Sequence, residues 1–374
     1  MFCYICIKKY KSLSIKYIFK SGRKSRISSG NRFPKEFFYC YFDLLQKKLD
    51  VDFIEEIDLG ISKKVNLFTR FLNKFSRILL DFPLMHSKKL LEWKNIKLLN
   101  KSSIIIVTTK SLGLSLGFLK LLRIIKKPVI FIVMGLLSSE SNFLKRIFYK
   151  LLLNKIKIVS ISKNEKKFLE SKIFNKPISY IPFGIDKDFW HPLDIELKNQ
   201  RYILAIGNDY NRDWDTLINA WEDYYPDLKI VTSIPIKTNK KNILIKKSSW
   251  GEEYISDKEI RNLYINSLFV IIPLKETMQP SGQSCCLQAM ACGTPVVMTK
   301  IKGSWDDTHL INRKNLLLIR PRSEVDLKNS IIELLNNKKL QKELSKNGRK
   351  LVEKHFNTSV MTHHLEKIIR ELCI

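Results

Sequence analysis

The chain has 374 residues, of which 45% are hydrophobic and 27% are charged, and its formal net charge is +30. This length exceeds a comfortable single core and predicts two domains, while the apolar fraction excludes a disordered or low-complexity protein. The basic residues are spread along the whole chain, which favours solvated helix faces over a specific nucleic-acid site, with a weak affinity for an anionic membrane face in addition.

The cysteines and the N-terminus indicate a reduced, cytoplasmic protein. Seven cysteines form an odd set, and the pair Cys3 and Cys6 has no second pair and no histidines at metal spacing, so no metal site is expected. Lysines from Lys8 onward and the lack of a small-residue cleavage site make a poor signal peptide. No segment has the length of a transmembrane helix. We expect a cytoplasmic location, with contact at the inner membrane face.

The N-terminal half alternates short apolar runs with longer helical patterns, which predicts a doubly wound α/β unit. Compact β-branched runs are typical of strands buried on both faces of a parallel sheet. The predicted strands are 13–19, 53–59, 104–108, 129–133 and 158–161. The predicted helices are 34–49, two pieces within 65–99, 114–125 and 143–153.

A second alternation begins after the segment 181–192, which reads IPFGIDKDFWHP. The predicted strands are 202–206, 229–232, 243–245, 268–272, 296–298 and 316–319. The predicted helices are 214–225, 257–267, 282–291, 324–336, 339–355 and 360–372. Two Rossmann-like units joined by a hinge near 182–192 would have a cleft between them, and ligands of such sheets lie beyond the carboxyl ends of the strands.

The stretch 277–299 contains no charged residue and reads TMQPSGQSCCLQAMACGTPVVMT. A Pro-Ser-Gly turn leads into a helix of small residues, which a Gly-Thr-Pro sequence ends before a Val-Val strand. The first turn of a helix that begins in a glycine-containing loop presents bare backbone N–H groups. Such a helix tip can bind a phosphate without a charged side chain.

Five stretches in this order resemble retaining glycosyltransferases of the GT-B fold, in the large family-four group that uses nucleotide sugars. They are SISKNEKKFL, YIPFGID, RYILAIGNDYNRDWDTLINAW, LFVIIPLKETMQPSGQSCCLQAMACGTPVVMT and NLLLIRPRSEVDLKNSIIELL. The resemblance implies two Rossmann-like domains facing a cleft: 1–183 on the acceptor side and 184–358 for the nucleotide sugar. It also implies that a C-terminal helix, 359–374, packs back on the N-terminal domain.

The chain departs from this family at two positions of a paired-glutamate motif. The second glutamate, which binds the donor ribose in the family, is Gln288 here, and the first, which contacts the donor sugar, is Pro280. A glutamine keeps an acceptor and gains donors, so Gln288 can retain part of the ribose contact. A further departure is that the family's histidine after the fourth strand is absent, with Met134, Gly135 and Leu136 in its place.

Arg212 is the expected clamp for the donor pyrophosphate, because a planar guanidinium suits a phosphate. The alternative for Arg212 is an ion pair with Asp213 or Asp215. The other expected donor-binding residues are Gly207, Asn208, Ser281, Gly282, Gln283, Ser284, Gln288 and Lys302. For the serines the alternative is a plain helix cap, and for Lys302 it is a solvated lysine.

The acceptor side of the cleft is expected to involve Gly22, Arg23, Arg26, Gly135, Gly184 and Asp186. For Gly22, Arg23 and Arg26 the alternative is an exposed basic loop. For Gly184 it is a turn in which glycine supplies an unusual backbone angle. Trp250 is a further candidate, either stacked on the nucleobase or part of the core.

The resemblance implies transfer of a sugar, with retention, from a nucleotide-diphosphate donor to an acceptor hydroxyl. The acceptor would be a saccharide or a lipid-linked precursor of a surface polysaccharide. No cofactor, no metal and no specific nucleic acid are expected, and the sequence supplies no convincing catalytic base. Two alternatives remain open: a sugar-nucleotide epimerase or phosphorylase on the same fold, and a degenerate subunit that binds a nucleotide or a polyanion.

Overall fold

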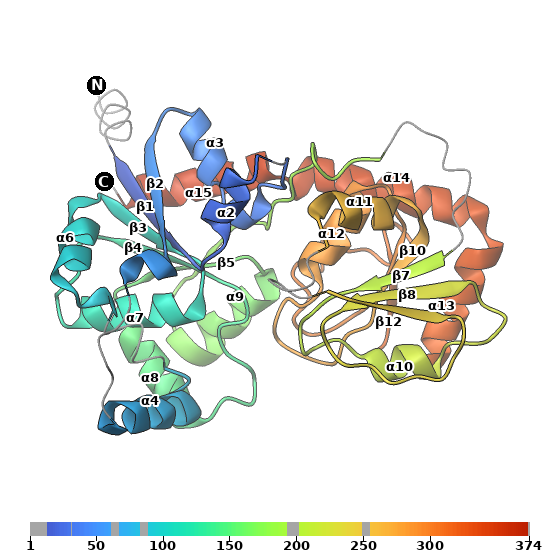
Figure 1. Ribbon diagram of the computed structural model, residues 1–374, viewed down its shortest axis with the longest axis horizontal. Coiled ribbons are helices and arrows are strands. Elements are labelled where there is room, and N and C mark those ends of the chain that lie inside the picture. Colours follow the sequence, from blue (N-terminus) through green and yellow to red (C-terminus); the bar gives the residue numbers. More distant parts are fainter. Residues whose placement is uncertain are drawn as a thin grey trace. The chain divides into compact units, whose positions relative to one another are not determined.

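The computed structural model describes residues 13–30, 32–60, 67–82, 89–192, 202–248 and 255–372. The chain forms two compact units (Figure 1). Unit 1 consists of Met1–Asn31, Phe38–Ile181 and Met361–Ile374, and unit 2 of Arg32–Phe37 and Pro182–Val360. The short segment Arg32–Phe37 therefore belongs to unit 2, although the sequence predicts it in the N-terminal domain.

Unit 1 contains a parallel sheet of six strands in the order β2-β1-β3-β4-β5-β6. Its strands are β1 (Ser14–Phe19), β2 (Asp50–Glu55), β3 (Ile104–Val107), β4 (Val129–Val133), β5 (Lys157–Ser160) and β6 (Ser179–Tyr180). Every residue of β3 and β4 is buried, as expected for central strands that have helices on both faces.

The helices of unit 1 supply much of its apolar core, although α2 (Arg23–Ser28) has no buried residue. They are α2 (Arg23–Ser28), α3 (Tyr41–Gln46), α4 (Leu67–Leu80), α6 (Trp93–Lys101), α7 (Lys110–Leu121), α8 (Phe143–Leu152), α9 (Lys163–Leu169) and most of α15 (Thr358–Glu371). Helix α15 packs in unit 1 through buried Met361 and Leu365, and Glu366 Oε2 lies 2.9 Å from Lys47 Nζ. The last helix of the chain is thus part of the first unit.

Unit 2 contains a second parallel sheet of six strands, in the order β12-β11-β10-β7-β8-β9. Its strands are β7 (Tyr202–Ile206), β8 (Asp227–Thr232), β9 (Ile243–Lys247), β10 (Ser267–Ile272), β11 (Val296–Thr299) and β12 (Leu317–Ile319). Its helices are α10 (Trp214–Asn219), α11 (Asp257–Ile265), α12 (Gln283–Ala291), α13 (Glu324–Asn336) and α14 (Lys338–His355). This strand order is that of a dinucleotide-binding Rossmann sheet.

One predicted helix is absent as a continuous element. Residues 34–49 form a short 3₁₀ turn, Glu36–Phe38, and then α3. Between them Tyr39 and Cys40 have positive φ angles of 47° and 72°, which no α-helix tolerates. Within the described residues, no helix combines the length and the apolarity that crossing a bilayer requires.

Candidate functional site

The sheet of unit 2 has a topological switch point between β7 and β10. These strands are neighbours, yet the chain continues from β7 to β8 on one side and from β10 to β11 on the other. Loop 207–213 follows β7 and loop 273–282 follows β10. The loops are joined by backbone hydrogen bonds from Asp213 to Pro273 (3.1 Å) and from Lys275 to Asn211 (2.8 Å). In open α/β sheets, ligands bind beyond the carboxyl ends of the strands at this point.

Arg212 belongs to the loop after β7, and its side chain is buried beneath the two loops, with 1% of it exposed. Nη2 donates to the carbonyl of Ile206 (3.1 Å) and lies 3.4 Å from Cys285 Sγ. Nη1 lies 3.2 Å from Asp209 Oδ2, while Nε and Nη1 make no hydrogen bond to the described residues. The guanidinium is therefore a buried positive charge with one half-exposed counter-charge, and in this conformation its fork faces the protein.

The expected alternative pairing of Arg212 with Asp213 or Asp215 is not observed. Asp213 instead caps α10, because its carboxylate accepts from the backbone N–H (3.3 Å) and the hydroxyl (2.8 Å) of Thr216. Asp209 takes the place of the predicted partners, since it lies three residues before Arg212 in a tight loop.

Gly207 and Gly282 enclose the guanidinium, one from each loop. A Cβ on Gly207 would lie 2.1 Å from Arg212 Nε, and Gly207 has a φ of +154°. A Cβ on Gly282 would lie 2.7 Å from Ile272 Cγ2 and 3.1 Å from Arg212 Nη1, and Gly282 has a φ of +76°. Both positions require glycine because any side chain would collide and the backbone angles disfavour other residues.

Helix α12 begins next to this buried charge, and no side chain caps it. Gly282 is its N-cap, and its first turn contains no acidic residue. The alternative of a plain serine cap is not observed, and the hydroxyl of Ser281 instead accepts from Asn211 Nδ2 (2.7 Å). Ser284 in the first turn is half-buried. An uncapped helix start carries a partial positive charge, and Arg212 adds a full charge directly behind it.

Two asparagines hold the loops in place around the helix tip. Asn211 Nδ2 also donates to Gln279 Oε1 (3.1 Å), so that it connects the β7 loop to the β10 loop. Asn208 Nδ2 donates to the carbonyl of Ser248 (3.1 Å), and its Oδ1 accepts from the backbone of Ser233 (2.6 Å). The side chain of Asn208, expected to contact the donor, therefore fixes the ends of β8 and β9.

Gln288 is buried in a polar network inside unit 2. Its Nε2 donates to Glu36 Oε1 (3.0 Å), and its Oε1 lies 3.4 Å from Tyr264 Oη. Glu36 Oε1 also accepts from Trp190 Nε1 (2.7 Å). Burial raises the pKa of Glu36 to about 7, although the hydrogen bonds from Gln288 and Trp190 favour its charged form. Sequence reasoning missed Glu36, which is 252 residues away from Gln288.

Lys302 is exposed and belongs to a loop that packs against the loop before α12. Its backbone N–H donates to Glu276 Oε1 (2.8 Å), and the N–H of Gly303 donates to the carbonyl of Thr277 (2.8 Å). A Cβ on Gly303 would lie 2.3 Å from the carbonyl oxygen of Gln279. The loop after β11 thus supports the 277–279 segment through its backbone.

Gly184 and Asp186 have structural contacts within unit 2. A Cβ on Gly184 would lie 2.3 Å from the carbonyl oxygen of Asn357, because two backbone segments cross here. Gly184 therefore allows two backbones to approach closely, and the unusual backbone angle of the alternative reading is not found. Asp186 is buried, and its carboxylate accepts from the backbone N–H groups of Lys35, Asp188 and Phe189, each at 3.2 Å.

The predicted acceptor-side residues Gly22, Arg23 and Arg26 lie in and beside α2 of unit 1. Gly22 is the N-cap, with a φ of 108°, and Arg26 lies in the last turn. Glu55 occupies this helix start, since its Oε1 accepts from the backbone of Arg23 and of Lys24 (2.8 Å). Burial lowers the pKa of Arg23, whose Nη1 donates to the carbonyl of Lys20 (3.0 Å). The tip of α2 is thus already neutralised by a carboxylate.

Gly135 follows β4 in unit 1 and has a φ of +72°. The adjacent N–H of Leu136 donates to Glu165 Oε1 (2.7 Å), and Gly135 also donates a backbone hydrogen bond to this carboxylate. Burial raises the pKa of Glu165 to about 7, against these hydrogen bonds and one from Ser160. An acid missed by sequence reasoning therefore lies at the carboxyl end of β4.

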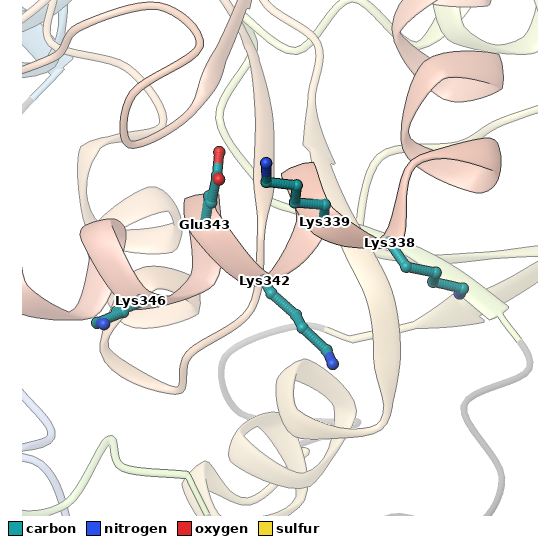
Figure 2. A pocket seen from close by; sticks show the side chains of 5 residues that line it. All are labelled: Lys338, Lys339, Lys342, Glu343 and Lys346. Carbon is teal, nitrogen blue, oxygen red and sulfur yellow. The ribbon is translucent and has the colours of Figure 1, made fainter.

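Unit 2 also has an open surface pocket of about 390 Å³ along the first half of α14. Lys338, Lys339, Lys342, Glu343 and Lys346 line it. In Figure 2, Lys339 and Glu343 point to one side of the helix, and Lys338 and Lys342 point to the other. Side chains that diverge along a single helix do not converge on one ligand, so this pocket is no candidate for the donor.

Two further predictions concern Trp250 and metal binding. Trp250 lies outside the residues that the structure describes. Among the residues that are described, no three His, Cys, Asp or Glu side chains are grouped so that they could hold a metal ion.

Comparison with known sequences finds a family match in the C-terminal part of the chain. Residues 243–351 match the family described as Glycosyl transferases group 1, and this range contains α12 and its tip. An uncharacterized glycosyltransferase of Methanocaldococcus jannaschii is 26% identical over 260 residues, which cover 64% of this chain and 68% of that protein.

Comparison with solved structures assigns the fold. Sucrose-phosphate synthase from Thermosynechococcus elongatus has a TM-score of 0.71 at 16% identity, covering 96% of this chain and 99% of that one. HepE of Anabaena, in complex with UDP and glucose, has a TM-score of 0.68 at 12% identity, with coverages of 96% and 99%. WaaG, a glycosyltransferase involved in lipopolysaccharide biosynthesis, has a TM-score of 0.62 at 13% identity, with coverages of 95% and 99%.

These findings confirm the predicted fold class, a GT-B architecture of two Rossmann-like units. The match of residues 243–351 to the Glycosyl transferases group 1 family, together with the similar archaeal glycosyltransferase, supports an enzyme of the hexosyltransferase type.

Proposed function

We propose that the protein moves a sugar from a nucleotide-diphosphate sugar to an acceptor hydroxyl, with the donor pyrophosphate at the tip of α12. The observation that carries this proposal is the uncapped, uncharged helix start with the buried guanidinium of Arg212 behind it, at the switch point of the sheet. The complex of HepE with UDP and glucose supports a nucleotide-sugar donor.

The proposed chemistry is stabilisation of the leaving group. As the bond between the sugar and the β-phosphate breaks, negative charge grows on the phosphate, and preorganised dipoles that are already aimed at it need no reorganisation. Arg212 acts in this proposal as a buried charge beneath the loop, because its side chain is 1% exposed. The low dielectric constant of these buried surroundings strengthens the attraction between this charge and a phosphate. Retention of configuration, as in the family-four group, belongs to the same proposal.

The proposed acceptor is a saccharide or a lipid-linked precursor of a surface polysaccharide. The role of WaaG in lipopolysaccharide biosynthesis supports this acceptor class, and the net charge of +30 supports work at an anionic membrane face. The location that follows is the cytoplasm, at the inner face of the membrane.

The test is release of nucleoside diphosphate from a panel of nucleotide-diphosphate hexoses, with and without acceptor extracts. Wild-type protein should turn over one donor, and Arg212→Ala should lower kcat/KM about a hundredfold, since it removes a charge that favours the transition state. Arg212→Lys keeps the charge and should recover part of the rate. If the two variants and the wild type had equal activity, Arg212 would have no role in the mechanism.

A second function, a subunit that binds the donor without transferring the sugar, is favoured by Pro280 and Gln288. These residues stand where the family-four group that the sequence resembles has its paired glutamates. Donor binding by isothermal titration, combined with no turnover of any donor by the wild type, would select this alternative.

A further inference from the structure

The outer face of α8 is apolar, although its inner face already packs in the core of unit 1. Tyr149 and Leu152 are buried in that core. On the opposite side, four large apolar side chains are 48–74% exposed: Phe143, Leu144, Ile147 and Leu151. Their spacing of i, i+1, i+4 and i+8 places them on one stripe of a helix. A helix on the surface of a soluble protein normally has polar residues on its outer face, so an exposed apolar stripe of this size indicates an interaction site.

Helix α4 lies beside α8 and also exposes large apolar side chains. The two helices are in contact, and Figure 1 shows them together at one end of unit 1. Just after α4, the ring of Phe82 packs 5.4 Å from that of Phe148, and Tyr149 Oη donates to the carbonyl of Asp81 (3.4 Å). Phe71 and Ile78 of α4, seven residues apart and on one face, are 65% and 76% exposed.

The charges on these two helices are all positive. Neither helix contains an aspartate or a glutamate. The basic side chains that the structure describes on them are Lys74, Arg77, Lys145, Arg146 and Lys150. Lys74, Arg77 and Lys150 are exposed, whereas Lys145 lies 3.4 Å from Asp81 Oδ2. The surface therefore combines large apolar side chains with basic ones.

We propose that this surface, the α4–α8 face, docks on an anionic lipid bilayer. It comprises Phe71, Ile78, Phe143, Leu144, Ile147 and Leu151 with Lys74, Arg77 and Lys150. The apolar side chains enter the acyl boundary, and the basic side chains contact the anionic headgroups. The inference rests on the proposed function in one respect: docking would present a lipid-linked acceptor to the enzyme.

The combination of side chains favours a bilayer over other occupants. A second copy of this basic chain would bring like charges together, which disfavours self-association through this face. The lysines of the α14 pocket offer charge alone, because the exposed large apolar residues of unit 2 do not include any on α14. Charge alone gives a weak, salt-sensitive contact, whereas inserted apolar side chains add affinity that salt does not remove.

The test uses the full-length protein and co-sedimentation with vesicles of phosphatidylcholine, with or without phosphatidylglycerol. The wild type should bind the anionic vesicles at least tenfold more tightly than the neutral ones. Phe143→Ser with Leu144→Ser should weaken this binding tenfold or more, since two side chains no longer enter the bilayer. Lys74→Gln with Lys150→Gln should weaken it about tenfold and reduce its salt dependence.

The matched control, Lys338→Gln with Lys342→Gln, removes the same charge from α14 and should change binding less than threefold.

Several outcomes would overturn the proposal. They are wild-type protein that ignores anionic vesicles, a Phe143/Leu144 double variant that binds as the wild type does, and a control variant that loses as much affinity as the α4–α8 variants. Sedimentation velocity that shows a dimer dissociated by the Phe143/Leu144 substitutions, with vesicle binding unchanged, would assign the face to self-association instead. Nucleoside diphosphate titration of the same variants should match the wild type. Vesicle binding without nucleotide binding would refute the proposed function and leave the docking face standing.

Discussion

At the scale of single residues, Glu165 links a buried carboxylate to the pH dependence of stability. The pKa of Glu165 rises from 4.5 to about 7 on folding, chiefly because of burial. Between these values the folded protein holds a proton that the unfolded chain has lost, so stability falls as pH rises through this window. Glu165→Gln removes the titration and keeps the acceptor for Leu136, while its amide can donate to Ser160 Oγ.

We therefore predict that the unfolding free energy of Glu165→Gln, relative to wild type, rises by up to about 1.4 kcal/mol per pH unit between about pH 5 and pH 7. Urea titrations across this range measure the difference. Glu170→Gln is the control of opposite sign. Burial opposes ionisation of Glu170, but hydrogen bonds from Ile178 and Lys166 lower its pKa, so the wild type should be the more stable protein at neutral pH. A flat difference for Glu165→Gln would contradict the assignment.

Glu36 gives a physical reason for the glutamine at position 288. A glutamate there would place a carboxylate about where Gln288 Nε2 now donates to Glu36, at 3.0 Å. Two acceptors would face each other in a buried site, and their charges would repel. Gln288 is thus suited to its neighbour in this chain, whatever its contact with the donor ribose.

We predict that Gln288→Glu lowers the unfolding free energy by at least about 2 kcal/mol at pH 8 and by less at pH 6, where the pair can share a proton. The reversed pair, Glu36→Gln with Gln288→Glu, should regain part of the loss because one donor again faces one acceptor. Denaturant unfolding of the three proteins at both pH values tests this. Gln288→Glu with wild-type stability at pH 8 would exclude the contact.

At the scale of elements, the crossing of the Gly184 and Asn357 backbones supports unit 2 at its chain ends. Ile185 N–H donates to the carbonyl of Phe356 (2.8 Å), and Thr358 N–H donates to the carbonyl of Ile185 (3.2 Å). Gly184→Ala would force two backbones apart, since its Cβ would lie 2.3 Å from Asn357 O. We expect a loss of at least about 2 kcal/mol in the unfolding free energy.

The matched control for this substitution is Gly348→Ala in the middle of α14. Its Cβ would meet the flexible Met290 side chain at 3.1 Å, and alanine favours the helix by up to about 1 kcal/mol. Its stability should stay close to that of wild type. If both variants unfold at the same denaturant concentration, close approach is not what demands glycine at position 184.

Elements with strong local patterns were predictable, whereas short or strained ones were not. The β-branched strands β3, β4 and β7 and the helix starts near Trp214 and Gln283 follow from periodicity and turn residues. Strand β6 has only two residues and carries no pattern. The break at Tyr39 and Cys40 has no glycine or proline to mark it, because its positive φ angles are imposed by tertiary packing.

At the scale of the whole molecule, the chain repeats one architecture with two different strand orders. The motifs 202–213 and 268–299 predicted the loops that meet at the switch point of unit 2. The sequence could not predict that Arg212 is buried between two glycines, nor that Glu36 from the first forty residues joins unit 2. Those facts depend on contacts between residues far apart in the chain, and local sequence patterns carry no information about such contacts.

The central claim is that the tip of α12 receives the anionic part of the donor, and Ser284→Asp tests it most directly. An acidic residue in the first turn leaves the helix intact or stabilises it by a few tenths of a kcal/mol, but it repels a phosphate at the same place. Val325→Asp, in the first turn of α13 and 64% exposed, is the matched control in the same unit.

The decisive measurement is isothermal titration of the wild type and these two variants with nucleoside diphosphates and the matching nucleosides. We predict that Ser284→Asp weakens diphosphate binding at least tenfold and nucleoside binding less than twofold, while Val325→Asp changes neither. Diphosphate binding by Ser284→Asp at wild-type affinity would place the phosphate elsewhere and contradict the account.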